Sequence, residues 1–280
     1  MLDATEPDRQ PLLPALDVEI ESLVSRIVAA AAPESIHELR IAIRRLLTLL
    51  RALRQDIDAA SYDNIRSALR GLLAATGPAR DAYVRKRTGM SLLESTRSIP
   101  AQDAKHYSSA LDAELDVAAI ALSWYLHDKG CFACLARTHD ALDRLRTADV
   151  DGHEVRTLRA RFDRLLGRIE RRLGRNLERA RKVHALRIRI KDARYLGEMP
   201  PSPSRRTQSA IRQLGKMQGA LGDLHDMEQL RVWLLKATLS SAARKKLQSS
   251  ARTAELELRD QCERRRKPLQ RAITRYLAGT

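Results

Sequence analysis

Aromatic residues are scarce in this sequence: they make up 4% of its 280 residues, with only two Phe and two Trp. Sheet cores and base-stacking nucleic-acid modules usually use more aromatic and β-branched side chains than this. Leu, Ala, Arg and Glu dominate instead, and all four favour helices. The hydrophobic share of 44% is enough for a folded core, in one large domain or two smaller ones. The composition therefore predicts an all-α fold.

Cysteine is scarce as well. Three Cys are too few for a disulfide framework, and they fit a reducing compartment. Cys131 and Cys134 have CxxC spacing, with His127 and His139 nearby, but no second CxxC pair follows. The segment instead has the pattern of an amphipathic helix, so we predict no metal site there.

Long apolar runs and secretion signals are missing too. No window approaches 18 uncharged apolar residues, which excludes a membrane-spanning helix. The N-terminus is acidic and has neither a basic region nor an apolar core of the kind that a secretory signal needs. We expect a soluble, cytoplasmic protein.

The motifs of common phosphate enzymes are also lacking. The sequence has no Gly-rich phosphate loop followed by Lys and Ser or Thr, no paired carboxylate cluster and no metal box. We therefore predict that the protein is not an enzyme and needs no cofactor.

Positive charge is abundant. The chain has 51 basic and 35 acidic residues, a formal net charge of +16, and Arg far outnumbers Lys. Arg presents a planar set of donors that matches phosphate oxygens two at a time, and it stays charged at any working pH. This excess indicates a partner of opposite sign: a nucleic acid, an anionic membrane or a phosphate polymer.

Apolar residues recur at intervals of three and four along nearly the whole chain, for example at Leu39, Ile43, Leu46, Leu50 and Leu53. This spacing predicts amphipathic helices. Pro and Gly predict breaks between roughly ten such helices. We place these breaks at Pro33 and around 77–78, 98–100, 129–130, 149–152, 200–203 and 222–223.

Two stretches of the sequence repeat. Residues 36–44 and 183–191 both read apolar-His-x-Leu-Arg-Ile-x-Ile-basic, with His37 and His184 in the same register. Downstream, residues 77–84 align with 222–229, and each begins with Gly and has Asp at its fifth position. We expect both glycines to end helices. The repeat predicts two helical bundles, over 10–148 and 149–280, related by pseudo-twofold symmetry.

The repeated Asp residues, Asp81 and Asp226, have two interpretations. Either they start a helix or they hold a basic side chain, and contact with a ligand is the weaker alternative. Asp223, next to the second glycine, is a further candidate for a helix cap.

On a helix, the repeated histidines share a face with cations. The first copy brings together His37, Arg40, Arg44 and Arg51, and the second His184, Arg187, Lys191 and Arg194. Like charges at this spacing cost stability, and no acidic residue is placed to neutralise most of either stripe. Glu198 falls at the end of the second stripe, where Arg51 stands in the first. We interpret the stripes as an anion site.

Three other interpretations were weighed. In the first, the stripes are solvated basic faces. In the second, the histidines are core residues that form hydrogen bonds. In the third, His37 or His184 is a phosphorelay histidine. A phosphorelay site usually needs a small residue after the basic one, where this chain has Ile41 and Ile188. That disfavours the third interpretation.

The two stripes and the two Gly–Asp segments together resemble the CHAD family, the conserved-histidine α-helical domain. The most specific marks are residues 36–45, 77–81, 183–195 and 221–226, and the likeness runs from about residue 15 to the end. It implies two four-helix bundles about a pseudo-twofold axis, with a basic pore or groove that binds inorganic polyphosphate. It also implies association with polyphosphate granules in bacteria.

The resemblance implies a set of ligand residues: His37, Arg40, Arg44, Arg45, Arg51, His184, Arg187, Arg189, Lys191 and Arg194, with Arg80 and His225 as further candidates. The chain departs from the family's pattern at Leu47 and Asp192, where a basic residue is usual, so neither is counted as a ligand. The triphosphatase-type domain fused to some relatives has no room in this chain.

The resulting prediction is non-enzymatic binding of inorganic polyphosphate. One alternative is a nucleic-acid-binding, nucleoid-associated protein, against which we note that the sequence shows no helix-turn-helix pairing. The other alternative is a scaffold that docks an acidic partner. The sequence leaves the oligomeric state open.

Overall fold

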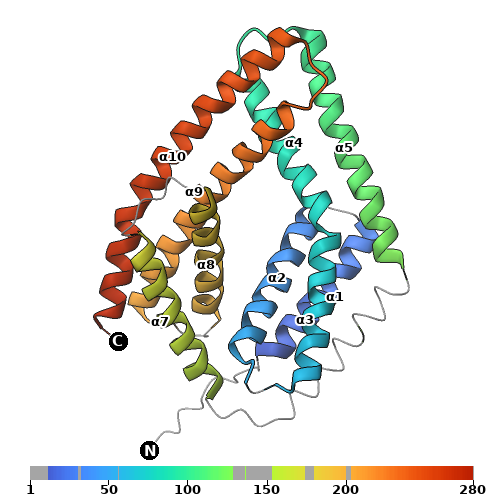
Figure 1. The fold of residues 1–280 in the computed structure, drawn as a ribbon. Helices are drawn as coiled ribbons and strands as arrows, with labels where there is room; N and C mark the ends of the chain where they lie inside the picture. The colour runs from blue at the N-terminus through green and yellow to red at the C-terminus, as the bar shows by residue number, and fades with distance from the viewer. Residues whose placement is uncertain are drawn as a thin grey trace, which may run out of the picture. The chain divides into compact units, whose positions relative to one another are not determined.

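The structure is a computed structural model that describes residues 12–30, 33–55, 57–128, 136, 153–173, 180–199 and 203–279. Within these ranges the chain forms nine helices and no strand, which confirms the predicted all-α class (Figure 1). The helices are α1 (Leu12–Ala30), α2 (Pro33–Ala52), α3 (Ala59–Ala75), α4 (Gly77–Ser95), α5 (Ala101–His127), α7 (His153–Leu173), α8 (Ala180–Glu198), α9 (Arg205–Leu234) and α10 (Ser241–Leu277).

Most predicted breaks that fall on described residues are confirmed. Helix α2 begins at Pro33, α3 and α4 meet at 76–77, and α4 and α5 are separated at 96–100. After the proline-rich stretch, Ser204 caps α9 by accepting a hydrogen bond from the Thr207 amide at 3.2 Å. The breaks predicted at 129–130 and 149–152 lie outside the described residues.

The predicted break at Gly222 is wrong, because α9 continues through it as a 30-residue helix. A single Gly costs a helix interior only about 1 kcal/mol relative to Ala, and no proline follows to stop the helix. The buried residues Leu221 and Leu224 carry the apolar face past this point. Asp223 is therefore inside a helix, and Asp81 lies beyond the first turn of α4, so neither is a helix cap.

The chain divides into two compact units that interleave along the sequence. The first unit consists of Met1–Gly77 with Leu122–Thr157, and the second of Pro78–Ala121 with Leu158–Thr280. The repeat boundaries at 10–148 and 149–280, and the pseudo-twofold symmetry, stay predictions.

In the first unit, α2 packs against both α1 and α3. The apolar face predicted for α2 is buried, including Leu39, Leu46, Leu49, Leu50 and Leu53. Because this face of α2 is buried, the charged side chains of the helix must lie on its remaining sides.

In the second unit, α4, α5, α9 and α10 share an apolar core that includes Tyr107, Leu111, Leu230 and Leu247. A Cβ atom at Gly89 of α4 would lie 2.7 Å from the Tyr107 hydroxyl of α5, so only glycine allows this close approach of the two helices. The long helices α9 and α10 also run side by side (Figure 1).

Helices α7 and α8 pack at the other end of the same unit. Phe162 of α7 meets Tyr276 of α10 edge-on, with ring centroids 5.3 Å apart. The Tyr276 hydroxyl donates a hydrogen bond to Asp163 at 2.8 Å. The predicted core positions of α8, Leu186, Ile190 and Leu196, are buried. The polar face of α8 is thereby turned away from the core.

Candidate functional site

The first stripe lies on α2, in the first unit. His37 and Arg51 are exposed, and the positions between them are half-buried: Arg40, Arg44 and Arg45. Glu38, the sequence neighbour of His37, pairs with Arg26 of α1 at 3.3 Å. As predicted from the helical register, this carboxylate does not neutralise the stripe.

Arg40 binds the end of a neighbouring helix. Its Nη1 atom donates to the Leu73 carbonyl at 2.6 Å and to the Thr76 hydroxyl at 2.7 Å. Thr76 is the C-cap of α3, where the last carbonyls lack helical partners and the helix dipole is negative. Arg40 therefore stabilises the packing of α2 on α3, whatever it contributes to ligand binding.

Two further cations of the first stripe are Arg44 and Arg51. Arg51 donates from Nε to the Leu47 carbonyl one turn earlier, at 3.1 Å, which orients the guanidinium along its own helix. In the part of the chain that the structure describes, no carboxylate forms an ion pair with Arg44.

The second stripe lies on α8, in the second unit. His184 is exposed, and Arg187, Lys191 and Arg194 are half-buried. Arg194 forms an ion pair with Glu198, with Nε 2.6 Å from Oε1. Because its charge is matched, the strongly basic part of this stripe runs only from His184 to Lys191.

His225 of α9 joins the second stripe. The rings of His184 and His225 are tilted to one another, with centroids 6.3 Å apart. Burial, assisted by the charges of Arg187, His184 and Lys191, lowers the pKa of His225 to about 4, while Asp81 of α4 opposes this. Side chains of α4, α8 and α9 thus lie near one another in the second unit.

Arg80 of α4 belongs to the same cluster. Its Nη1 atom is buried and has no hydrogen-bond partner among the described residues. Burial lowers the pKa of Arg80, and the nearby Asp226 carboxylate opposes this most strongly. Burial raises the pKa of Asp226 above its usual value, and the charges of Arg80, Arg187 and Arg87 partly oppose this. The expectation that Asp226 holds a basic side chain fits this arrangement.

Arg87 is a member of the cluster that the sequence interpretation missed. It acts electrostatically on Arg80, Asp223 and Asp226. A cavity of about 380 Å³ lies here, lined by residues of α4, α9 and α10 that include Arg87, Ser91, Asp223 and Asp226. The signal was present, because Arg87 follows Arg80 by seven residues and so shares its helix face.

The permanent charges of this cluster nearly balance. Its cations are Arg80, Arg87, Arg187 and Lys191, and its carboxylates are Asp81, Asp223 and Asp226. The carboxylates offset much of this positive charge electrostatically. A polyanion that binds here would counter the positive charges that lower the pKa of His225 and would so favour its protonated form.

Arg189 lies on a different face of α8. It follows His184 by five residues, about 140° around the helix. Burial lowers the pKa of Arg189, and the charges of Arg172 and Arg168 on α7 lower it further. Of the predicted ligand residues on α8, this one is not brought to the His184 stripe.

Candidate metal ligands are scattered among the described residues. No group of three or more His, Cys, Asp or Glu residues gathers there in a way that could hold an ion. Cys131 and Cys134 lie outside the described residues. Cys262 is buried in α10, and burial raises the pKa of its thiol to about 11.

No helix within the described ranges combines the length and the apolar character needed to cross a bilayer.

Comparison with known proteins gives a consistent result. The family model for the CHAD domain matches residues 18–235. The crystal structure of the CHAD domain from the plant Ricinus communis superposes with a TM-score of 0.67 at 18% identity, covering 96% of this chain and 90% of that one. PptA from Streptomyces chartreusis gives a TM-score of 0.56 at 16% identity, with coverage of 94% and 96%. No curated protein matches the sequence.

Proposed function

The chain therefore belongs to the CHAD domain family, and on that premise we propose that it binds inorganic polyphosphate without altering it chemically. Membership of the family accounts for the fold. Two features of this chain support the binding function: its net positive charge and the cluster of charged side chains on α4, α8 and α9.

One observation carries the proposal: in the second unit, the His184 stripe meets His225 and Arg80. Guanidinium, ammonium and imidazole groups from three helices there offer hydrogen-bond donors to one anionic chain. Arg80 adds a buried donor without a partner among the described residues, which a phosphate oxygen would satisfy.

A phosphate polymer suits this site better than a nucleic acid does. It presents closely spaced charges and nothing to stack. The cluster around His225 consists mainly of charged and imidazole side chains, with Tyr83 as an aromatic neighbour whose ring centroid lies 5.8 Å from the Arg80 guanidinium. Non-specific binding of single-stranded nucleic acid usually relies on aromatic side chains as well as charge. The formal charge of +16 supports either polyanion, and the predominance of charged over aromatic side chains in the cluster favours the phosphate polymer.

The test is a titration of the full chain with long-chain polyphosphate, double-stranded DNA and tRNA at matched salt. We expect polyphosphate to bind most tightly, with an affinity that falls steeply as salt rises because counterions are released. Nucleic acid that binds as tightly as polyphosphate, or more tightly, would reject the proposal in favour of a nucleic-acid-binding protein.

The non-enzymatic part of the proposal has its own test. Polyphosphate incubated with the protein should keep its chain length and release no phosphate, with and without added divalent cations. Shortened chains would show that the protein is an enzyme.

Location in the cell is a further part of the proposal. A fluorescent fusion produced in bacteria that accumulate polyphosphate should concentrate in cytoplasmic polyphosphate granules. Reversal of charge at Arg187 should disperse it, and an evenly spread wild-type fusion would contradict granule association.

A further inference from the structure

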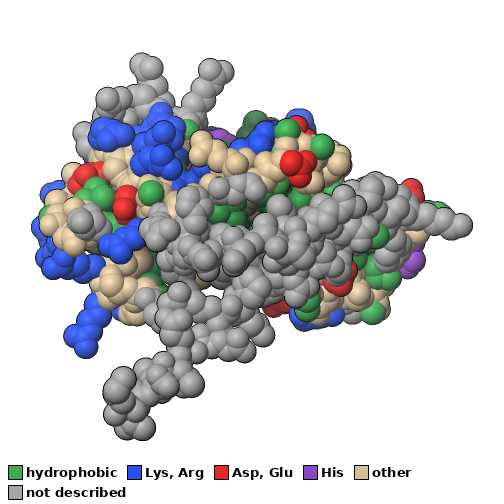
Figure 2. All heavy atoms as spheres, turned by 90° about the horizontal axis from the view of Figure 1, so that it is seen from below, with side chains coloured by type: hydrophobic (Ala, Val, Ile, Leu, Met, Phe, Trp, Pro, Cys, Tyr) green, Lys and Arg blue, Asp and Glu red, His purple; other side chains and the backbone are tan. Residues whose placement is uncertain are grey.

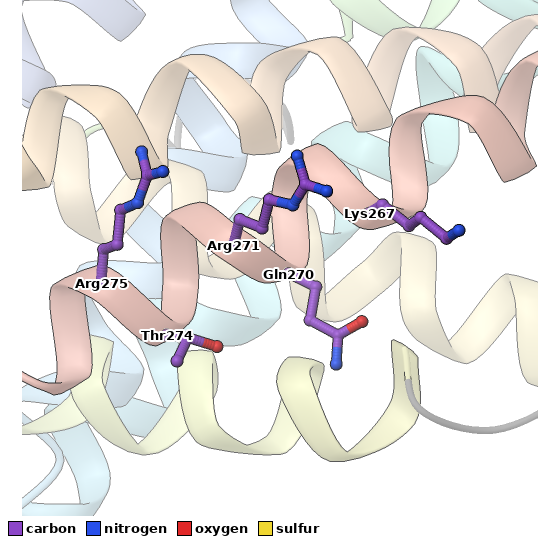
Figure 3. Close-up of a pocket in the computed structure, with 5 residues that line it drawn as sticks. All are labelled: Lys267, Gln270, Arg271, Thr274 and Arg275. Carbon is purple, nitrogen blue, oxygen red and sulfur yellow. The ribbon is translucent and has the colours of Figure 1, made fainter.

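The C-terminal half of α10 carries a row of cations that the histidine stripes do not include. Lys267, Arg271 and Arg275 are exposed and follow one another at intervals of four residues, about 6 Å along the helix. Together with Gln270 and Thr274 they line a cavity of about 420 Å³ (Figure 3). The side chains of Arg271 and Arg275 extend from the same side of the helix, opposite Gln270 and Thr274.

These three cations, here called the α10 row, have no carboxylate partner among the described residues. Other cations of the same helix do have one. Arg259 pairs with Glu228 at 2.9 Å and with Glu255 at 2.8 Å. Like charges one helical turn apart repel each other by a few tenths of a kcal/mol per pair. The α10 row thus carries an electrostatic cost that an anion would relieve.

The α7 carboxylates that contact this part of α10 are bonded to hydroxyl groups. Glu170 accepts a hydrogen bond from the Thr274 hydroxyl, and Asp163 accepts one from Tyr276 at 2.8 Å. Glu170 therefore reaches the edge of the cavity without forming an ion pair with Arg271 or Arg275. Where α7 packs on α10, these two carboxylates thus accept hydrogen bonds from neutral hydroxyl groups and form no ion pair with the cations of the α10 row.

The space-filling view agrees with this division of charge. Figure 2 shows Lys and Arg side chains gathered on the side of the second unit that carries α7 and the end of α10. The cluster around His225, by contrast, holds three carboxylates beside its four permanent cations.

We infer that Lys267, Arg271 and Arg275 form a second phosphate-binding site of the second unit, which holds another part of a polyphosphate chain. This inference rests on the proposed function and extends it. Two separate contacts within one unit make binding depend on chain length, because only a long chain occupies both at once. The α10 row supplies charge that the nearly balanced His225 cluster lacks.

The test combines Lys267→Gln, Arg271→Gln and Arg275→Gln in one variant. The matched control combines Lys236→Gln, Lys245→Gln and Arg252→Gln, which removes the same charge from exposed positions of the same unit. For the α10 variant we expect the slope of log affinity against log salt to fall by about two, as the loss of three contacts to a single strand predicts. The control should change that slope little.

Chain length gives a second measurement. The advantage of long-chain over short-chain polyphosphate should shrink at least about tenfold in the α10 variant and persist in the control, because the loss of one of two linked contacts removes the avidity. Arg271→Lys with Arg275→Lys should keep most of this advantage, since the charges remain. Circular dichroism would check that all variants are folded.

The outcomes separate the inference from the proposed function. If the wild-type protein does not bind polyphosphate, the proposed function fails. If it binds and both triple variants lose affinity equally, charge acts diffusely and the inference is wrong. If the α10 variant weakens binding of DNA and not of polyphosphate, the row serves nucleic acid and the inference is again overturned.

Discussion

The two histidine stripes are copies of one sequence motif placed in different surroundings. Arg40 and Arg187 occupy the same position of the motif. In the first unit, Arg40 donates to the last carbonyls of α3. In the second, Arg187 lies near His225 and Asp226, inside a cluster of titratable groups. The comparison shows that the motif places a cation on a helix face, while the neighbouring helix decides what the cation does.

The ends of the stripes differ in the same way. The first ends at the exposed Arg51, whose Nε donates to the Leu47 carbonyl of its own helix. The second ends at the half-buried Arg194, which forms an ion pair with Glu198. The two copies of the motif thus end in different ways, one in an exposed guanidinium and the other in an ion pair.

The largest effect should come from Arg187→Glu. If the second stripe is the main ligand site, the substitution removes a donor and adds a carboxylate beside Asp226, so polyphosphate affinity should fall about tenfold to a hundredfold. Titration at matched salt measures the loss. Arg212→Glu, at an exposed position of α9, is the matched control. Equal losses in the two variants would mean that no defined site exists.

Arg40→Ala should act mainly on stability. It removes two hydrogen bonds from a charged donor to the end of α3, which should lower the free energy of unfolding by about 2 kcal/mol. Arg44→Ala, one turn further along the same face, should cost less than about 0.5 kcal/mol. Thermal and urea denaturation followed by circular dichroism measure both. If Arg40→Ala proved as stable as Arg44→Ala, the proposed structural role of Arg40 would be refuted.

His225 should make binding depend on pH. The pKa of His225 is about 4 without ligand, and a bound polyanion raises it. Affinity should therefore rise as pH falls from about 7 through the pKa of the complex, by at most about tenfold per pH unit for one proton, and level off near pH 4.

The test variant is His225→Gln, which should flatten the rise. His37→Gln in the first stripe is the control. His225 is neutral in the folded protein and protonates more readily when unfolded, so stability also falls below about pH 6.5. Circular dichroism must therefore show a folded protein at each pH. An unchanged pH dependence in His225→Gln would assign the proton to another group.

Sequence reasoning predicted the helices well because burial follows the spacing of apolar residues. Leu39, Leu46 and Leu186 are buried as expected. It failed at Gly222, where the helix continues through the glycine. The long apolar face of α9 is buried on both sides of this residue, and that packing keeps the helix intact. A weak local preference was overridden by packing.

The candidate site was predictable in its residues and not in their partners. The histidines and their cations could be placed on one face from helical geometry alone, and the same geometry separates Arg189 from them. The bonds from Arg40 to Leu73 and Thr76 join residues more than 30 positions apart in the chain, so no local sequence pattern predicts them. Such contacts depend on how α2 packs against α3.

The smallest effect is expected from Glu198→Gln, which makes the end of the second stripe more like the first. Loss of the carboxylate frees the charge of Arg194 for a ligand, so polyphosphate affinity should rise about twofold to threefold, as a half-exposed ion pair allows. Glu257→Gln, an exposed position of α10 with the same charge change, is the control. An increase in both variants would reflect net charge, and an increase in Glu198→Gln alone would extend the ligand track to Arg194. A decrease would show that Glu198 holds Arg194 in its binding position, so that pairing, and not permanent charge, is what the second stripe requires at its end.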